Sequence, residues 1–517
     1  MNKEMVNSME NNILLYNGNF WRFGSKAYDW IGITNGIITD AGYGDSYLSR
    51  MDSYSEKEDI SGRIVLPGFY DCHAHFVQTA TKYISLDLIG CRSYSDIKDK
   101  IEEWIDKNPR TTIIRAFGLE VSNLEEGCYP TRKILDGFTK DYAIWINSRD
   151  FHCSILNTRA FHELKVPLAM EGVEYDDNSS PSGRIYGKAN ALTRKKIIQS
   201  YSPSDRYKSI VELSQRIIKK GVTSIHVMEG GFEFYENDAR DMNRYKDQLP
   251  VDINLFYSTM DFEKVEEMGL EWIGGDVYLD GSFTSKSAAI YEKYNDHEGN
   301  GELYFTQDEI NEFILESYEK NLNTTMHAVG DRALECLITA HEHASSIYPV
   351  SSLRHRVEHA ELASDSQIER ASRIGLIFSM QPAYEYMFGG PGKMYERRLG
   401  KRYRETNQFR KLTDMGIVIC GGSDSDLTPI DPVLGIHAAV NHPVEENRVS
   451  VEEAVKFFTF NAAYSVKEEK RKGSIEIGKL ADLVILDRDI FSIAPEEIIS
   501  AEISATIKNG FVVYRNF

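Results

Sequence analysis

Two histidines separated by one residue are the first pair in this sequence whose spacing could support chemistry. His73 and His75 end the stretch Leu66-Pro-Gly-Phe-Tyr-Asp-Cys-His-Ala-His75, which continues from an apolar run. In an extended strand the side chains of residues i and i+2 point to the same side, so the two imidazoles project together. Two neighbouring imidazoles form half of a site for a borderline-soft divalent metal. The histidines of a single His-x-His pair are more often ordinary surface or core residues than metal ligands. Whether this pair binds metal therefore depends on what the rest of the chain contains.

Three further residues of the same chemical character end other strand-like segments, namely His327, His359 and Asp424. Neutral imidazoles bind Zn²⁺ well, and a carboxylate beside the metal can both ligate it and accept a proton. A metal that activates water and polarises a carbonyl permits hydrolysis near neutral pH. Each residue alone would be interpreted as a core or loop side chain. All five in this order favour a hydrolytic metal site.

The elements that must bring these residues together are short apolar runs that alternate with helical patterns such as Tyr207–Lys220. This alternation is typical of parallel strands joined by crossover helices, and it predicts an α/β fold. The runs that end in polar or ionisable residues are Val65–His75, Thr223–Glu229, Asp276–Asp280, Thr324–His327, Arg356–His359, Gly375–Gln381 and Ile417–Asp424. A further strand at Ile113–Glu120 or Ala143–Asn147 completes a (β/α)8 TIM-like barrel, in which functional residues lie at the carboxyl ends of the strands.

Both ends of the chain carry a different pattern, of short strands joined by turns such as Asn35-Gly36. We expect residues 1–64 and 465–517 to form one small composite β-sandwich domain, with two unrelated hairpins as the alternative. Residues 65–464 then form the barrel. The segment from about 80 to 200 is too long for one βα unit, and it predicts an insertion over the barrel mouth.

The composition limits the partners of this 517-residue chain, which has 59 basic and 79 acidic side chains and a net charge of −20. The acidic excess argues against nucleic-acid or anionic-membrane binding. It leaves a small molecule as the expected partner, with a homodimer as an open alternative. The start of the chain lacks the pattern of a signal peptide, and no apolar stretch is long enough to span a bilayer. The six cysteines are scattered, which is typical of reduced thiols in a cytoplasmic protein.

A set of motifs in one order along the chain resembles the metal-dependent amidohydrolase superfamily. The match is to its YtcJ-like branch (amidohydrolase family 3), which includes N-substituted formamide deformylases. The motifs are Leu66–His75, Gly221-Val-Thr-Ser-Ile-His226, Asp280-Gly-Ser-Phe-Thr-Ser-Lys-Ser-Ala-Ala289, His327-Ala-Val-Gly-Asp-Arg-Ala333, Arg354-His-Arg-Val-Glu-His359, Ser379-Met-Gln-Pro382, Gly422-Ser-Asp424 and Lys472-Gly-Ser-Ile-Glu-Ile-Gly-Lys-Leu-Ala-Asp-Leu483. The resemblance implies a barrel hydrolase that binds metal through four histidines, with Asp424 as a ligand and the proton acceptor. These histidines are His73, His75, His327 and His359.

Three residues are candidates for contact with the substrate. Asp150-Phe151-His152 is similar to an Asp-Gly-His segment of the family, which makes His152 a candidate. His226 ends another strand, where it either faces the site or has a structural role. Gln381, in the motif Ser379-Met-Gln-Pro382, is the third candidate.

Asp276 marks the main departure from the family pattern. The family typically has a lysine at this position, four residues before the Asp-Gly of its fourth strand, and that lysine is carbamylated to bridge two metals. Asp276 cannot form a carbamate, although its carboxylate is a candidate metal ligand, and Glu229 or Lys188 could compensate. We therefore expect one tightly bound Zn²⁺ or similar divalent ion, with a second ion left open.

The function that follows is hydrolysis of a C–N bond in an amide, an N-substituted formamide or a cyclic amide, by metal-activated water. One alternative within enzymes is isomerase or lyase chemistry at the same metal site. A second alternative, from another class, is a metal-poor binding protein that kept the fold. The histidines and Asp424 argue against this last interpretation, because a binding protein has no need of a complete ligand set.

Overall fold

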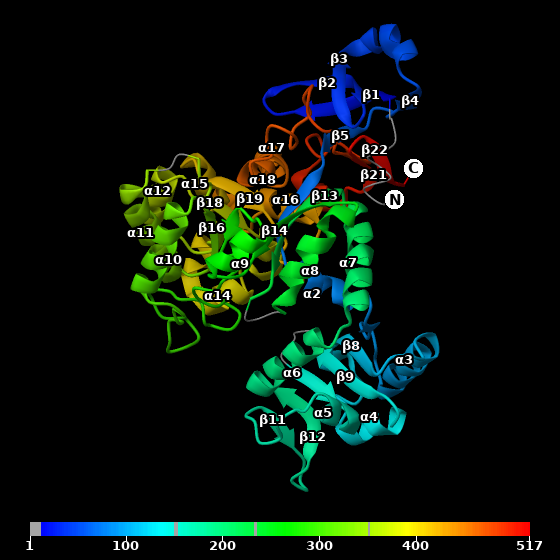
Figure 1. Ribbon diagram of the computed structural model, residues 1–517, viewed down its shortest axis with the longest axis vertical. Helices are drawn as coiled ribbons and strands as arrows, with labels where there is room; N and C mark the ends of the chain where they lie inside the picture. Colours follow the sequence, from blue (N-terminus) through cyan, green and yellow to red (C-terminus); the bar gives the residue numbers. More distant parts are fainter. Residues whose placement is uncertain (1–11, 149–152, 232–234, 350–351, 517) are drawn as a thin grey trace. The chain divides into compact units, whose positions relative to one another are not determined.

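The computed structural model describes residues 12–148, 153–231, 235–349 and 352–516, which fall into two compact units. The barrel unit comprises the described residues up to 76 together with 214–231 and 236–516. The inserted unit comprises the described residues of 77–213 and Tyr235. Each unit has its own strands and its own hydrophobic core, and Figure 1 labels the strands and helices of both.

Eight parallel strands form the barrel, each hydrogen-bonded to the next in the order given. They are β6 (Phe69–Ala74), β13 (Val222–Glu229), β14 (Asp252–Tyr257), β15 (Trp272–Ile273), β16 (Asn323–Ala328), β17 (Arg356–His359), β18 (Ile377–Met380) and β19 (Val418–Gly421). The chain beyond β19 closes the ring, because the Asp424 N–H donates to the His73 carbonyl at 2.7 Å. The His75 N–H donates to the Ser425 carbonyl at 2.8 Å. The predicted α/β barrel is confirmed.

One barrel strand lies where the sequence did not place it. The prediction of Ile113–Glu120 or Ala143–Asn147 is wrong, because these segments lie in the sheet of the inserted unit. The missing strand is β14, whose residues Asp252-Ile-Asn-Leu alternate in polarity. A parallel strand covered on both faces normally has a continuous apolar sequence, and the alternating polarity of this segment does not predict a strand of that kind. The candidate at Asp276–Asp280 lies beyond β15, where only an isolated bridge from Tyr278 joins the neighbouring strand.

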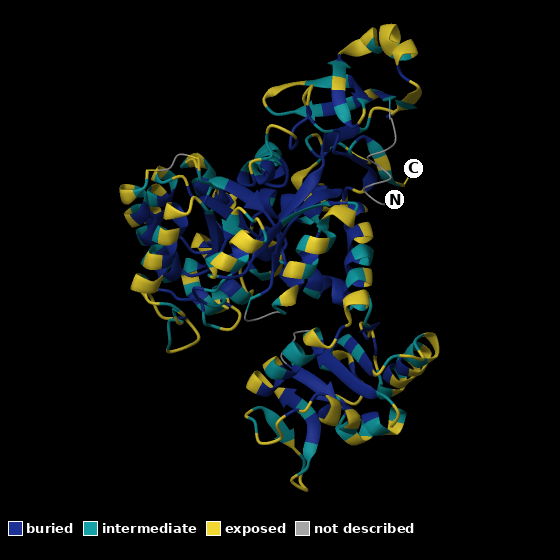
Figure 2. Cartoon of the chain, in the orientation of Figure 1, coloured by how far each residue is buried: buried dark blue, intermediate teal, exposed yellow. Residues whose placement is uncertain are grey.

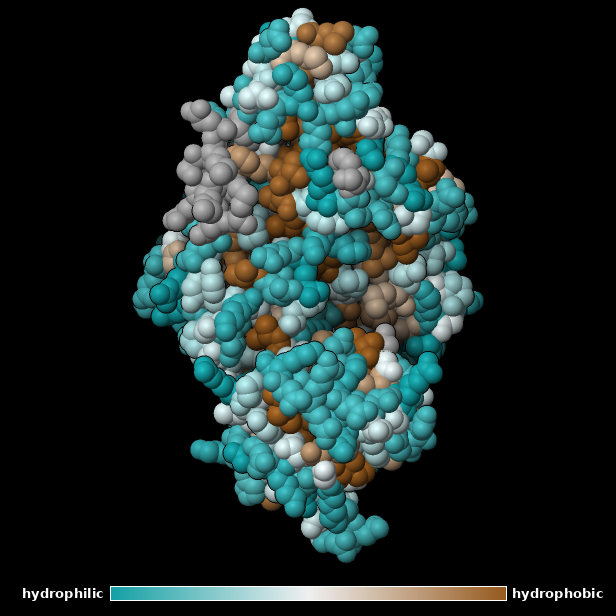
Figure 3. Space-filling view, turned by 90° about the vertical axis from the view of Figure 1, so that its right-hand side faces the viewer, coloured by the Kyte–Doolittle hydropathy of each residue, from teal (hydrophilic) through white to brown (hydrophobic). Residues whose placement is uncertain are grey.

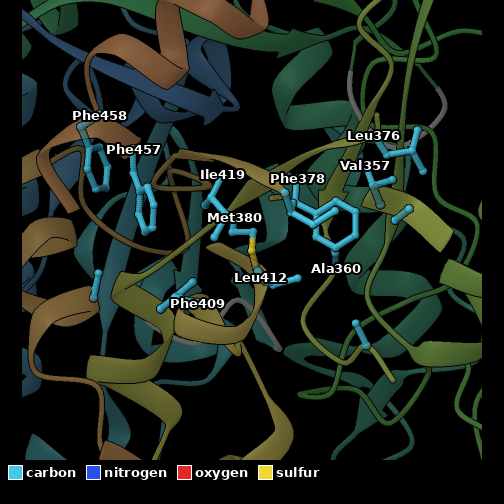
Figure 4. Close-up of a cluster of buried hydrophobic side chains, with 14 of the residues drawn as sticks. Val357, Ala360, Leu376, Phe378, Met380, Phe409, Leu412, Ile419, Phe457 and Phe458 are labelled. Atoms are coloured by element: carbon cyan, nitrogen blue, oxygen red, sulfur yellow. The ribbon is translucent and has the colours of Figure 1, made fainter. Parts of the chain in front are cut away.

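The outer face of the barrel packs against helices through the alternation of side chains along each strand. Phe378 and Met380 of β18 lie in one cluster with Phe409 of α15 (Phe409–Asp414) and Phe457 of α17 (Val451–Phe457), as Figure 4 shows. Burial of each such side chain contributes about 1.5–3 kcal/mol. Ser379, between the two outward residues, instead donates across the barrel interior to the Cys72 carbonyl.

The helices of the barrel unit follow the strands as crossovers. They are α8 (Asn237–Tyr245) after β13, α9 (Phe262–Glu267) after β14, α10 (Gln307–Glu319) after β15, α11 (Asp331–Ile347) after β16, α12 (Asp365–Arg373) after β17, α13 (Ala383–Phe388), α14 (Met394–Leu399) and α15 after β18, and α16 (Pro432–Val440), α17 and α18 (Phe460–Ser465) after β19. Figure 2 shows exposed residues along the outer faces of these helices and buried residues along the strands. Hydrophilic side chains cover most of the face in Figure 3, with apolar side chains in smaller groups.

A second sheet takes its strands from both ends of the chain. Its order is β22-β21-β20-β5-β1-β2-β3, with β4 paired to β1. The strands are β1 (Asn12–Arg22), β2 (Ser25–Thr34), β3 (Ile37–Gly42), β4 (Glu56–Asp59), β5 (Ile64–Pro67), β20 (Leu483–Leu486), β21 (Ile503–Lys508) and β22 (Phe511–Arg515). The two ends meet where Val484 of β20 pairs with Leu66 of β5 in antiparallel register. We propose that these strands constitute the composite domain expected from the sequence.

The inserted unit holds a six-stranded sheet in the order β11-β12-β10-β9-β8-β7. Its strands are β7 (Leu86–Asp87), β8 (Ile113–Leu119), β9 (Ala143–Ser148), β10 (Cys153–Leu156), β11 (Val173–Tyr175) and β12 (Pro181–Tyr186). Its helices include α3 (Tyr94–Lys107), α4 (Arg132–Phe138), α5 (Thr158–Glu163) and α6 (Gly187–Gln199). Throughout the described ranges of both units, no helix combines the length and the apolar character needed to cross a membrane.

The pairing of both chain ends predicts the effect of a carboxyl-terminal truncation. Deleting residues 488–517 removes β21, which is buried along its whole length and pairs with β20. It also removes Lys508, whose ammonium donates to Asp252 and Asp482 at 2.8 Å each. We expect the truncated chain to be insoluble, because the apolar strand β20 would lose its partner and its exposed edge would aggregate. The soluble fraction after centrifugation measures this, with a chain ending at Arg515 as the control. A soluble truncation that unfolds cooperatively would contradict the dependence.

Candidate metal centre

Six side chains selected from the sequence converge at the carboxyl ends of the barrel strands. They are His73 in β6, His75 just after β6, Asp276 three residues after β15, His327 in β16, His359 at the end of β17 and Asp424 three residues after β19. Their ligand atoms form overlapping groups of three, within each of which the atoms lie within 4.8 Å of one another. Five of the six residues are buried, and Asp424 is nearly so, with 13% of its side chain exposed.

Unusual backbone conformations position two of these residues. His359 and Asp424 have φ angles of 74° and 49°, in the left-handed region that costs a non-glycine residue about 1–3 kcal/mol. At Asp424 the hydrogen bond from its N–H to the His73 carbonyl stabilises this strained backbone conformation. Gly422 makes this approach possible, because a Cβ there would lie 2.6 Å from the backbone nitrogen of His73.

Two glycines bring Asp276 inward. Gly274 and Gly275 have φ angles of 103° and 56°, and a Cβ on Gly274 would lie 2.0 Å from the Thr325 carbonyl oxygen. The N–H of Asp276 donates to the Ser258 hydroxyl at 3.0 Å, which anchors the residue to the segment after β14. The backbone therefore approaches both neighbouring strands closely. A short carboxylate can reach the histidines from here.

The first donor set consists of His73 and His75 facing two carboxylates. The Nε2 atoms of His73 and His75 lie 3.4 and 3.1 Å from Oδ1 of Asp424. The same nitrogens lie 3.8 Å from Oδ1 and 3.5 Å from Oδ2 of Asp276, respectively. Ligands about 2.1 Å from a tetrahedral ion are separated by roughly 3.4 Å, so this spacing suits an ion between the side chains.

The second donor set places His327 and His359 on the other side of Asp276. His327 Nδ1 and His359 Nε2 each lie 3.5 Å from Oδ1 of Asp276. An N–H···O hydrogen bond normally spans about 2.7–3.2 Å, so these distances are too long for direct hydrogen bonds. Asp276 thus stands between two pairs of histidines, with Oδ2 toward His75 and Oδ1 toward the second pair.

The far nitrogen of each histidine ring has an acceptor, which fixes the tautomer. His73 Nδ1 donates to Glu358 at 2.7 Å, and His359 Nδ1 donates to Gln381 Oε1 at 2.8 Å. His75 Nδ1 faces the carbonyl of Met228 at 3.3 Å, and His327 Nε2 faces the carbonyl of Gly281 at 3.2 Å. A ring that donates from one nitrogen presents a lone pair on the other, which is the form that binds metal.

Several of the atoms that face the centre lack hydrogen-bond partners. Among the described residues, the buried atoms without a partner include His73 Nε2, His327 Nδ1, His359 Nε2 and Asp276 Oδ1. Buried polar atoms are normally hydrogen-bonded, so four such atoms without partners in one buried region call for a missing group. The donor set of imidazole nitrogens and carboxylate oxygens fits a divalent metal ion.

The charges at the centre raise the pKa of a histidine and lower the pKa values of the carboxyl groups. Burial opposes the charged form of His73, but Asp276 and Asp424 raise its pKa well above the ordinary value. Burial alone would raise the pKa of Asp276, yet the histidines hold that pKa well below its usual range. Burial also opposes the charged form of Asp424, but His73 and His75 lower the pKa of this carboxyl, so both carboxylates make the buried region favourable for positive charge.

Glu358 is a functional candidate that the sequence reasoning missed. Besides His73, its carboxylate accepts hydrogen bonds from Thr325 and from the buried Arg356, which contacts Glu358 at 2.9 Å. A carboxylate behind a metal-binding histidine fixes the ring and raises its basicity. The available signal was the i, i+2 charged pair Arg356 and Glu358 inside an apolar strand, which is unusual unless both face a polar interior.

The candidate substrate contacts are placed differently. Nδ1 of His226 accepts a hydrogen bond from Arg356 at 2.8 Å, and this histidine is fully buried. Gln381 accepts from His359, as described above. His152 lies outside the described residues. All three assignments to substrate binding stay predictions.

The parallel barrel and the donor set at its carboxyl end define a protein of the metal-dependent hydrolase class. Residues 56–514 match the model of the amidohydrolase family, so the chain belongs to that family. The resemblance drawn from the motifs is confirmed.

Individual relatives cover nearly the whole chain. The chain is 28% identical to the YtcJ protein of Bacillus subtilis (strain 168), over 93% of this chain and 95% of that protein. It is 22% identical to an N-substituted formamide deformylase of Arthrobacter pascens, over 89% and 90%. The solved structure of an uncharacterized metal-dependent hydrolase from Pyrococcus furiosus has a TM-score of 0.78 and 27% identity, covering 93% of this chain and 100% of that one.

The geometry predicts that replacing His73 and His75 together by Ala abolishes metal retention. The change removes both imidazoles of the first donor set, while the hydrogen bonds that close the barrel come from the backbone. Metal content after gel filtration measures the effect, and circular dichroism checks that the fold is kept. His343→Ala, at an exposed helical position, is the matched control and should retain metal. Parental metal affinity in the double variant would refute the ligand assignment.

Proposed function

We propose that this protein is a metal-dependent amidohydrolase that cleaves a C–N bond in an amide, an N-substituted formamide or a cyclic amide. The observation that carries the proposal is the set of buried imidazole and carboxylate atoms without partners, which belong to overlapping groups of candidate metal ligands. Membership of the amidohydrolase family supports it, as does the similarity to an N-substituted formamide deformylase.

His73, His75, His327, His359, Asp276 and Asp424 would hold the metal, for which Zn²⁺ is the best candidate because imidazole and carboxylate suit it. When bound, the ion supplies Lewis acidity, which activates water as a nucleophile and polarises a carbonyl group. His73 and His75 each lie within 3.8 Å of both Asp276 and Asp424, whereas His327 and His359 lie 3.5 Å from Asp276. His359 also belongs to a wider group with His73 and Asp424. We infer that the first set binds an ion tightly and the second set binds weakly.

Asp424 is the proposed general base. Its Oδ1 faces the Nε2 atoms of His73 and His75, so the carboxylate would lie beside the ion that activates the water. The carboxylate takes one proton from this water as the oxygen adds to the carbonyl carbon. It then returns that proton to the nitrogen as the C–N bond breaks, so the products are a carboxylic acid and an amine.

A substrate panel tests the function. The metal-loaded protein is incubated with simple amides, N-substituted formamides and cyclic amides, and released amine or ring opening is measured by mass spectrometry. Hydrolysis of at least one class that stops after chelation and returns with Zn²⁺ would support the proposal. Conversion to isomers or elimination products without uptake of water would instead show isomerase or lyase chemistry.

Replacing Asp424 by Asn should lower turnover by roughly 10²-fold or more, because the amide cannot accept a proton at neutral pH. The size of the side chain is kept, so thermal unfolding should be close to that of the parent. Asp308→Asn, at an exposed position in the first turn of α10, is the control and should leave turnover unchanged. Near-normal turnover in the Asp424→Asn variant would rule out this role.

The number of metal ions is a separate prediction. We expect one ion per chain to remain after brief treatment with a weak chelator, and a second to bind only from excess metal. Bicarbonate should not change activity, because the bridging position carries Asp276 and not a lysine that could be carbamylated. Elemental analysis and assays with and without bicarbonate measure both points. Two ions that resist the chelator equally would contradict the ranking of the two donor sets.

A further inference from the structure

Tyr384 contacts the proposed general base from a segment that the sequence did not connect with catalysis. Its hydroxyl donates a hydrogen bond to Oδ2 of Asp424. The other oxygen of this carboxylate, Oδ1, faces His73 and His75. The two oxygens of Asp424 therefore have separate partners, one in the metal centre and one outside it.

The tyrosine is itself firmly held. It is 4% exposed and lies in an aromatic cluster, with its ring 5.6 Å from that of Phe388 in an edge-on arrangement. Its backbone N–H donates to the carbonyl of Gln381 at 2.9 Å. Since the side chain of Gln381 accepts from His359, one short turn contacts residues from two different strands of the centre.

The contact matters because the Asp424 carboxylate has few other constraints. Its backbone is fixed by the hydrogen bond to the His73 carbonyl, but rotation about the Cβ–Cγ bond can still tilt the plane of the carboxylate away from His73 and His75. A phenol that is fixed by packing and donates to one oxygen fixes the plane of the carboxylate, so that the other oxygen faces the two histidines. Neutral donors to a carboxylate form strong hydrogen bonds, so this restraint is effective.

We propose that Tyr384 is a positioning residue, which holds the Asp424 carboxylate so that Oδ1 faces the metal ligands and accepts the proton. The inference rests on the proposed function for its catalytic consequence, and on geometry alone for its effect on metal binding.

The test compares Tyr384→Phe with two tyrosine controls. Tyr386→Phe lies on the same helix at an exposed position, and Tyr395→Phe removes a buried tyrosine hydroxyl that donates to Glu361 and not to Asp424. We expect Tyr384→Phe to lower kcat roughly 10- to 100-fold with little change in KM, because the lost bond is to a charged group. Zinc affinity, measured with a competing chelator, should fall roughly 10- to 100-fold, as for other groups that orient metal ligands. Both controls should match the parent.

A double-mutant cycle separates positioning from general stability. In an Asp424→Ala background, Tyr384→Phe should change zinc affinity by less than about twofold, because no side-chain oxygen remains at position 424 to accept the hydrogen bond. Placing 4-aminophenylalanine at position 384 keeps a donor on the ring and should restore affinity, and this also answers the case in which Tyr384→Phe does not fold. An equal loss in both backgrounds, or parental kcat and zinc affinity in Tyr384→Phe, would overturn the proposal. Should the parent bind zinc but hydrolyse no substrate, the proposed function fails, while the zinc cycle still decides the role of Tyr384.

Discussion

The structure depends most on one electrostatic constraint, which is the burial of two carboxylates within the same group of four imidazoles. An ionised carboxylate is very unfavourable in a dry interior unless positive charge or hydrogen bonds compensate it. Oδ1 of Asp276 has no hydrogen-bond partner among the described residues, and the nearest imidazole nitrogens lie 3.5 Å or more away. Protonated histidines in direct ion pairs would lie closer. A cation placed between the groups satisfies both the charges and the distances.

The same constraint explains why the histidines around the carboxylates are themselves hydrogen-bonded to a second group of residues. Each histidine gives its far N–H to an acceptor, and where that acceptor is the charged Glu358, a further cation balances it. Arg356 supplies this charge from within the barrel, where it is fully buried. Removing one partner of such a buried pair typically lowers the free energy of unfolding by about 3–5 kcal/mol. Arg356 and Glu358, which lie behind the candidate metal ligands, therefore also stabilise the barrel. Stability and ligand orientation thus rest on the same residues.

The sequence was sufficient to select candidate ligands that lie together in the structure, but not the residues that orient them. The order of His73, His75, His327, His359 and Asp424 after apolar runs predicted a convergence that the structure contains, because the ends of parallel strands meet at one rim. The positions of Gln381 and Tyr384 depend on which way the chain turns after β18, and no local pattern encodes that. The strand β14 was missed for a related reason, since its polar residues obscured a buried run. Residues that act through contacts between distant segments leave little signal in one sequence.

Asp276 shows how the backbone determines what a short side chain can reach. A carbamylated lysine reaches the centre by its length, whereas an aspartate must be carried there by the main chain. The pair Gly274-Gly275 does this, because both residues adopt positive φ and a side chain on Gly274 would collide with the Thr325 carbonyl. The Ser258 hydroxyl then fixes the N–H of Asp276. The two glycines and the Ser258 hydroxyl therefore set the position from which the short side chain of Asp276 comes within 3.5 Å of His327 and His359.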